Sequence, residues 1–220
     1  MFKYKFLIRK PTPTIKQLYL IEMRKYLMIF SILIISIAVS AQGTYNFNVI
    51  KENPITSVKN QSSTGTCWSF SGVALLESEL IRMNKGEFDL SDMYIVRKNF
   101  EDKAKKYARL HGSINFSQGG SFADVVETIN DFGILPEEAY QGLNYGSETH
   151  DHSELDKVLT GYMNGVIESR NLTPVWFNGF NAILDSYLGE IPRTFIYEGK
   201  EFTPNSFAEY LELNQDDYIS

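Results

Sequence analysis

The sequence predicts an α+β fold in which helices predominate, from three observations. Apolar residues recur at three- and four-residue spacings between Cys67 and Ile81, which predicts a buried amphipathic helix of about four turns. The same periodicity returns from Trp176 to Leu188. A β-hairpin is predicted over residues 195–202, where aromatic and apolar side chains flank a turn at Gly199.

Capping and turn residues place the other elements. Ser91 precedes an apolar-periodic stretch and is the expected N-cap of a helix that ends at His111 and Gly112. Gly133 is expected to end a further helix that starts at Phe122. The remaining expected segments are extended chain over 42–60 with a short strand near 54–58, a loop over 61–66, an extended exit over 134–140, a polar inserted region of helical character over about 146–175, and a short helix over 206–213.

The charge distribution excludes one class of partner. Residues 1–41 hold seven of the 21 basic residues and one of the 27 acidic residues, leaving 14 basic and 26 acidic residues, a net charge of −12, in the rest. So acidic a body repels the phosphate backbone of nucleic acids. Nucleic acid is therefore not an expected partner.

The first 41 residues are predicted to be an N-terminal extension followed by an export signal over 23–41. Arg24 and Lys25 precede an apolar run over 27–39, and small residues up to Ala41 complete a Sec-type layout with Gln42 as the mature N-terminus. The run is shorter than the roughly 20 apolar residues that a membrane span needs. We therefore expect a secreted or periplasmic protein without stable membrane association after cleavage; the alternative is an uncleaved membrane anchor.

Cys67 is the only cysteine of the chain, so an internal disulfide is excluded, as is a structural metal site built on several thiolates. Most isolated cysteines are small buried hydrophobes. Cys67, however, falls where a glycine-containing loop meets the start of a predicted helix, and a helix N-terminus stabilises a thiolate. This position favours a nucleophile.

Acyl transfer also needs hydrogen-bond donors directed at the developing oxyanion. Gln61 lies six residues before Cys67 across the loop, so its side-chain amide can fold back beside the thiol. The backbone N–H of Cys67 would be the second donor. Trp68 is expected to pack at the start of the helix and to hold the thiol in place.

Three blocks together resemble the papain-like peptidase family. Residues 61–71 are similar to its segment with the oxyanion glutamine and the nucleophile, residues 88–92 to its Leu-Ser segment, and residues 119–140 to its glycine pair, helix and exit. The resemblance implies a helical left domain that holds Cys67, a β-rich right domain, a thioester acyl-enzyme, a peptide or protein substrate and no cofactor. It also implies that Gly119 and Gly120 line the substrate cleft, although an ordinary turn is the alternative.

Finer features resemble the bleomycin hydrolase and aminopeptidase C branch. Thr64 stands where many family members have a disulfide cysteine, and residues 60–68 follow the pattern of that branch. Residues 184–192 and 203–208 are similar to later blocks of the branch, which extends the resemblance to roughly residues 50–220.

The general-base histidine of papain-type enzymes follows the nucleophile by about 130–150 residues, yet the chain has only His111, His150 and His152. None of the three is assigned as the base. His150 and His152 are closely spaced, but two ligands alone are weak evidence for a metal site, so no metal site is expected. In the bleomycin hydrolase and aminopeptidase C branch, the catalytic histidine and the asparagine that orients it lie much further along the chain. We therefore expect an N-terminal part of a cysteine peptidase, of aminopeptidase or endopeptidase type, with the right domain largely missing. The alternative is an inactive fragment of the same fold, and the oligomeric state stays open.

Overall fold

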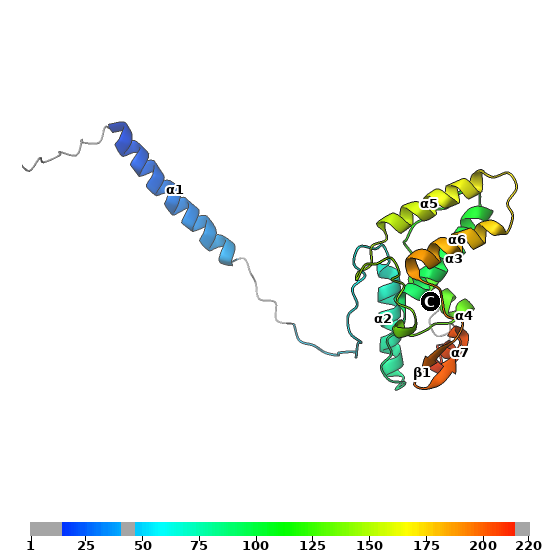
Figure 1. The fold of residues 1–220 in the computed structure, drawn as a ribbon. Helices are drawn as coiled ribbons and strands as arrows, with labels where there is room; N and C mark the ends of the chain where they lie inside the picture. The colour runs from blue at the N-terminus through cyan, green and yellow to red at the C-terminus, as the bar shows by residue number, and fades with distance from the viewer. Residues whose placement is uncertain (1–14, 41–46, 214–220) are drawn as a thin grey trace, which may run out of the picture. The chain divides into compact units, whose positions relative to one another are not determined.

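The computed structural model describes residues 15–40 and 47–213 of the chain. The chain divides into two units, residues 1–51 and 52–220, which are described separately. In the first unit, α1 (Ile15–Ser40) is a helix of 26 residues, so it begins before Met23, the expected start of the signal (Figure 1). The expected cleavage after Ala41 lies outside the described residues. None of the described helices combines the length and the apolar character that crossing a membrane requires.

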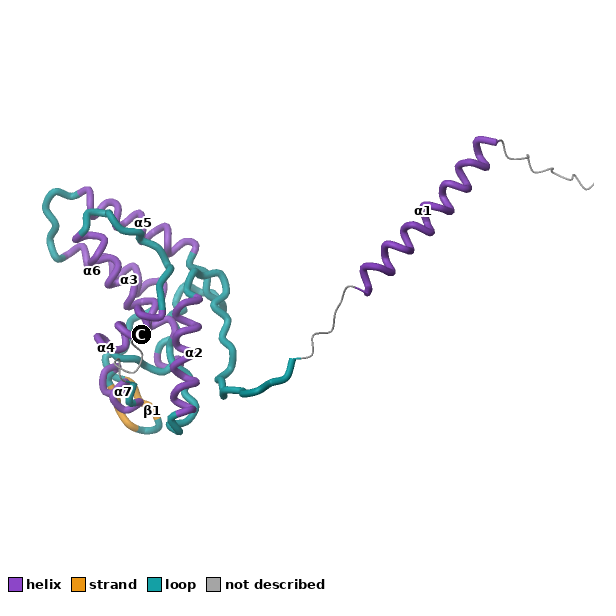
Figure 2. The backbone as a smooth tube through the Cα atoms, turned by 180° about the vertical axis from the view of Figure 1, so that it is seen from behind, coloured by secondary structure: helices purple, strands orange, loops and turns teal. Residues whose placement is uncertain are grey.

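The described part of the second unit, residues 52–213, consists of helices, loops and one small sheet (Figures 1 and 2). The strands β1 and β2 pair antiparallel, with Phe195 opposite Phe202, so the predicted hairpin is confirmed. The predominance of helices is confirmed as well. The elements are α2 (Cys67–Arg82), α3 (Asp92–Arg109), α4 (Phe122–Phe132), the 3-10 turn η1 (Glu137–Ala139), α5 (Ser153–Glu168), α6 (Val175–Leu188), β1 (Phe195–Tyr197), β2 (Lys200–Phe202) and α7 (Pro204–Leu211).

Helix α3 is the centre of the packing, because it contacts α2, α4, α5 and α6. Its buried residues Ile95 and Phe100 belong to one apolar core with Val73 of α2 and Phe180 of α6. Helices α2 and α4 approach closely at Gly72, where an added Cβ would lie 2.8 Å from Val125. Burial of this continuous apolar surface is the main stabilising contribution to the unit that holds Cys67.

The helix termini follow the capping signals of the sequence. Ser91 Oγ accepts a hydrogen bond from the backbone N–H of Tyr94 at 3.1 Å, which confirms the predicted N-cap of α3. Helix α4 begins with a capping box at Ser121 and ends at Gly133, whose φ is +77°. Helix α7 begins at Pro204, two residues earlier than expected, because the Thr203 hydroxyl caps it.

Two local expectations are wrong, and one needs refinement. Residues 54–58 form no strand, because no neighbouring backbone pairs with them; Thr56 Oγ1 instead donates to the Glu77 carboxylate of α2. The segment 134–140 is not extended throughout, since η1 turns within it. The polar region over 146–175 contains α5, whose apolar residues are buried: Leu155, Leu159, Met163 and Val166. Their recurrence at helical spacing was a signal for this helix.

Candidate active site

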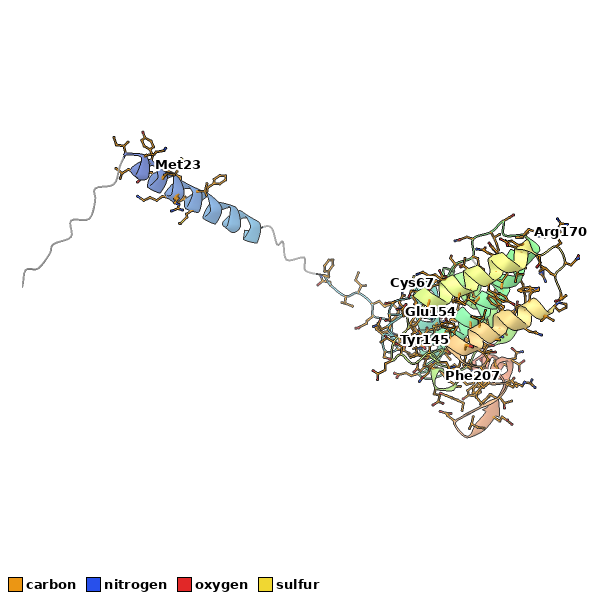
Figure 3. All side chains as sticks on the ribbon, turned by 45° about the horizontal axis from the view of Figure 1, so that its top comes forward. Met23, Cys67, Tyr145, Glu154, Arg170 and Phe207 are labelled. Atoms are coloured by element: carbon orange, nitrogen blue, oxygen red, sulfur yellow. The ribbon has the colours of Figure 1, made fainter. Side chains whose placement is uncertain are left out.

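Cys67 is the first residue of α2 (Figure 3), and its side chain is exposed. Its neighbours Thr66, Trp68 and Ser69 are all buried. The chain therefore presents one thiol to solvent from an otherwise buried helix start, which rules out the alternative of a small buried hydrophobe. The predicted position at a helix N-terminus is confirmed.

Hydrogen bonds hold the residues that follow Cys67. The indole N–H of Trp68 donates to the carbonyl of Gln118 at 2.9 Å. Ser69 Oγ donates to the carbonyl of Asp92 at 2.8 Å, which ties α2 to the first turn of α3. Because these side chains reach inward to different segments, the rotation of the first turn of α2 is set, and with it the direction of the thiol.

The loop that precedes Cys67 is closed by its own side chains. Gln61 Nε2 donates to the carbonyl of Thr64 at 2.7 Å, and Thr64 Oγ1 donates to the carbonyl of Gln61 at 2.9 Å. The hydroxyls of Thr64 and Thr66 share a further bond of 2.5 Å. A glutamine amide carries two N–H donors, so the bond to Thr64 leaves one of them, and the approach of the Gln61 amide to the thiol stays a prediction.

Residues 150–152 hold the same loop from outside. The backbone N–H of Ser63 donates to the carbonyl of His150 at 3.0 Å, and the N–H of His152 donates to the carbonyl of Ser63 at 3.2 Å. Ser63 and Asp151 thus form a parallel bridge. The sequence offers no signal for this contact, because the two segments are distant in the chain and neither forms a regular strand.

The histidines take different positions. His111 is exposed after the end of α3, as expected. His152 is fully buried, and burial together with His150 lowers its pKa to about 4, so its imidazole is neutral at pH 7. His150 is half-buried, its ring lies edge-on to Phe70 at 6.3 Å, and burial lowers its pKa.

Cys67 and His150 line two adjoining pockets. Cys67 lines a pocket of about 320 Å³ with residues of α2 and of the segment 55–59. His150 lines the other pocket, of about 280 Å³, with Asp89 and Glu137, and the two pockets share Ser57, Lys59, Phe70 and Asp92. Within residues 15–40 and 47–213, no three His, Cys, Asp or Glu side chains are placed to hold a metal ion.

The predicted rim residues Gly119 and Gly120 are exposed on the segment before α4. A Cβ added at Gly120 would lie 2.5 Å from the Trp68 ring, so this glycine lets the segment pack on the indole. At Gly119 the nearest atom to an added Cβ is Ser117 Oγ at 4.0 Å, which leaves room for a side chain. Gly120 therefore has a packing role that the sequence did not reveal.

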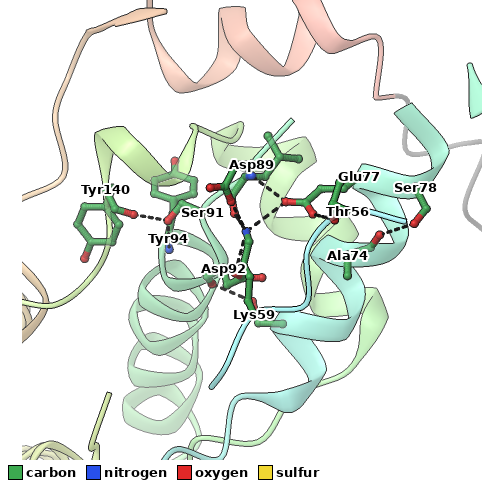
Figure 4. Close-up of polar contacts among 12 residues, drawn as sticks. Thr56, Lys59, Ala74, Glu77, Ser78, Asp89, Ser91, Asp92, Tyr94 and Tyr140 are labelled. Atoms are coloured by element: carbon green, nitrogen blue, oxygen red, sulfur yellow. Dashed lines mark hydrogen bonds and ion pairs between the residues drawn. The ribbon is translucent and has the colours of Figure 1, made fainter. Parts of the chain in front are cut away.

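A charge cluster with two buried carboxylates, Glu77 and Asp92, joins the segment 55–59 to α2 and to the start of α3 (Figure 4). Lys59 Nζ lies 3.1 Å from a Glu77 oxygen, 2.8 Å from Asp89 and 3.1 Å from Asp92. Burial lowers the pKa of Lys59, but Asp92, Asp89 and Glu77 together raise it above its ordinary value. Burial raises the pKa of Asp92 to about 7 and that of Glu137 to about 8.

A sequence profile of the family described as "Papain family cysteine protease" matches residues 44–171. Cysteine proteinase 1, mitochondrial, of Saccharomyces cerevisiae is 26% identical over 121 residues, which is 46% of this chain and 24% of that protein. A viral cathepsin of Autographa californica nuclear polyhedrosis virus is 33% identical over 70 residues, 32% of this chain and 22% of that protein. The crystal structure of PepW from Lactobacillus rhamnosis aligns with a TM-score of 0.55 at 19% identity, covering 79% of this chain and 47% of that one, which supports the fold. This chain therefore spans less than half the length of each of these proteins.

Proposed function

Because this chain belongs to the papain family of cysteine proteases, we propose that Cys67 is the nucleophile with which it hydrolyses peptide bonds. The observation that carries the proposal is the exposure of Cys67 at the first residue of α2 between buried neighbours. The exposed thiol is open to a substrate at this point. Peptides and proteins are the proposed substrates.

The proposed reaction proceeds through a thioester. The Cys67 thiolate attacks the peptide carbonyl carbon, and the carbonyl oxygen becomes an oxyanion that accepts hydrogen bonds from the Gln61 side chain and the Cys67 backbone N–H. Collapse of the tetrahedral species breaks the C–N bond, and the amine leaves with a proton. Water then attacks the thioester, releasing the acid and the thiol.

The proton transfers of this reaction need a general base. His111 is exposed at the far end of α3, while His150 and His152 belong to the segment that supports the loop, and the His150 ring lies against Phe70. We assign the base to none of the three. Gly119 and Gly120 are proposed to border the bound peptide beside Cys67, because their segment packs on Trp68.

The nucleophile is tested with p-nitrophenyl acetate, an activated ester that acylates a thiolate without a strong base. We expect a burst of one equivalent of p-nitrophenol per chain, which Cys67→Ala removes, because Cys67 is the only thiol. The matched control is Ser186→Ala on α6, whose hydroxyl donates to the carbonyl of Ala182 in the same helix, and its burst should equal that of the parent. A burst that survives in Cys67→Ala would exclude this nucleophile.

Peptide turnover by the same preparations separates the proposed peptidase from an inactive member of the family. A fluorogenic peptide should be hydrolysed slowly by the 220-residue chain, since no imidazole is assigned to Cys67. Fast turnover that His150→Phe abolishes would instead assign His150 as the base. A peptide with a free amino terminus, compared with its acetylated form, distinguishes an aminopeptidase from an endopeptidase.

We further propose that residues 23–41 direct export of the protein, from the basic, apolar and small-residue layout that ends at Ala41. N-terminal sequencing of the exported protein is expected to begin at Gln42. An exported or membrane-bound form that retains Met23 would contradict cleavage and support an anchor. Replacing Arg24 and Lys25 by glutamine should reduce export, because the basic region orients the signal.

A further inference from the structure

One residue outside the nucleophile loop holds the chain on both sides of Cys67. Gln118 Oε1 accepts a hydrogen bond from the backbone N–H of Gly65 at 2.8 Å. The Gln118 carbonyl accepts the indole N–H of Trp68 at 2.9 Å. Gly65 lies two residues before Cys67 and Trp68 one residue after it, so Gln118 bridges the loop and the first turn of α2.

The approach of these segments depends on glycine at both contact points. A Cβ added at Gly65 would lie 3.1 Å from the Cβ of Gln118. On the other side of the bridge, the Trp68 ring lies 2.5 Å from the place where a Cβ of Gly120 would be. The segment 117–120 is therefore packed tightly against the loop, and the bond from Gly65 is formed within this contact.

The bridging segment is itself anchored to α3. Lys103 Nζ donates to the carbonyl of Ser117 at 2.9 Å and also to the carbonyl of Gly119. The position of Gln118 is thus set by a helix of the core. With Cys67 as the only cysteine, the link between the loop and this segment is entirely noncovalent.

We propose that Gln118 is a positioning residue of the active site. By holding the amide of Gly65, its side chain keeps the Cys67 thiol and the Gln61 amide at a constant distance from Gly119 and Gly120. This role rests on the proposed function of Cys67 as a nucleophile. The bond from the Trp68 indole goes to the backbone carbonyl of Gln118 and does not involve the Gln118 side chain, so substitutions at Gln118 test the bond to Gly65 alone.

The test compares Gln118→Met with Gln118→Glu in the full chain. Methionine has nearly the shape of glutamine but lacks a strong acceptor, whereas glutamate retains an oxygen for the Gly65 amide. In Gln118→Met we expect hydrogen exchange of the Gly65 amide to become about tenfold faster and acylation of Cys67 by p-nitrophenyl acetate to slow about tenfold, corresponding to one lost hydrogen bond. In Gln118→Glu we expect exchange at Gly65 to stay as in the parent.

The exchange measurement requires no catalysis, so it distinguishes a failure of this role from a failure of the proposed function. Exchange of the Leu80 amide, in the buried part of α2, serves as the internal reference. Unchanged exchange at Gly65 in Gln118→Met would overturn the proposal. Equally faster exchange at Gly65 and Leu80 would also overturn it, because that result indicates a general loss of stability and not the loss of one local bond.

Discussion

We expect the substitution Lys59→Met to lower the free energy of unfolding by about 3–5 kcal/mol at pH 8, the usual cost of leaving a buried charge without its partner. The side chains of Glu77 and Asp92 are 1% and 3% exposed, and the Lys59 ammonium lies 3.1 Å from each. Methionine fills much of the same space but supplies no charge and no donor. The carboxylates would then remain buried against each other.

The free energy of unfolding lost in Lys59→Met should become smaller as the pH falls. Burial raises the pKa of Asp92 from 3.8 to about 7, so the native protein binds this proton more tightly than the unfolded chain does. The stabilising effect of that proton is present below pH 4 and is lost as the pH rises through about 7. Without Lys59 the pKa of Asp92 rises further, and the variant should therefore lie closer to the parent at pH 5 than at pH 8.

Urea unfolding at both pH values measures the effect, with Lys85→Met as the matched control. Lys85 pairs with Glu212, whose side chain is 67% exposed, at 2.5 Å. Such an exposed pair contributes at most about 1 kcal/mol. Equal losses in the two variants, or a loss at Lys59 that does not depend on pH, would contradict the role of Lys59 in neutralising buried carboxylates.

The substitution Gly133→Ala is expected to destabilise the fold by about 4 kcal/mol, a value reached by few single substitutions. Gly133 has φ +77° and ψ −161°, a region that is essentially restricted to glycine. An added Cβ would also overlap the backbone of Pro204 and Asn205 at the start of α7. The backbone bond from Ile134 to the carbonyl of Pro204, 3.1 Å long, would have to break.

Gly189→Ala separates the two causes. Gly189 has nearly the same conformation, φ +84° and ψ 160°, but the nearest atom to an added Cβ is 3.8 Å away on Asn144. Gly189→Ala should lower the free energy of unfolding only by the conformational cost of about 1–3 kcal/mol. Near-ultraviolet circular dichroism should change in Gly133→Ala alone, because Phe207 of α7 packs against several aromatic rings. Equal unfolding free energies of the two variants would contradict a clash with α7.

Much of the site could be read from local sequence. The loop of small and polar residues before Cys67, followed by helical periodicity, located the nucleophile candidate at the first residue of α2. Ser91 and Gly133 marked helix ends for reasons that a few neighbouring residues contain: a hydroxyl that accepts a backbone N–H, and a conformation that only glycine adopts readily. Such signals are local, so they survive without knowledge of the tertiary structure.

The sequence by itself thus determined the family, the nucleophile candidate and most helix boundaries, whereas the tertiary structure decided what holds them together. The bond from Gly65 to Gln118 joins residues 53 positions apart, and Lys59 meets Glu77 18 positions away. Residues 150–152 bind the loop before Cys67 through backbone hydrogen bonds, although their sequence indicates only a polar region. Hydrophobic periodicity records which face of a segment is buried, but it does not record which distant segment lies against that face. Those partners are settled only when the core packs and each buried polar group must find a hydrogen bond or a countercharge.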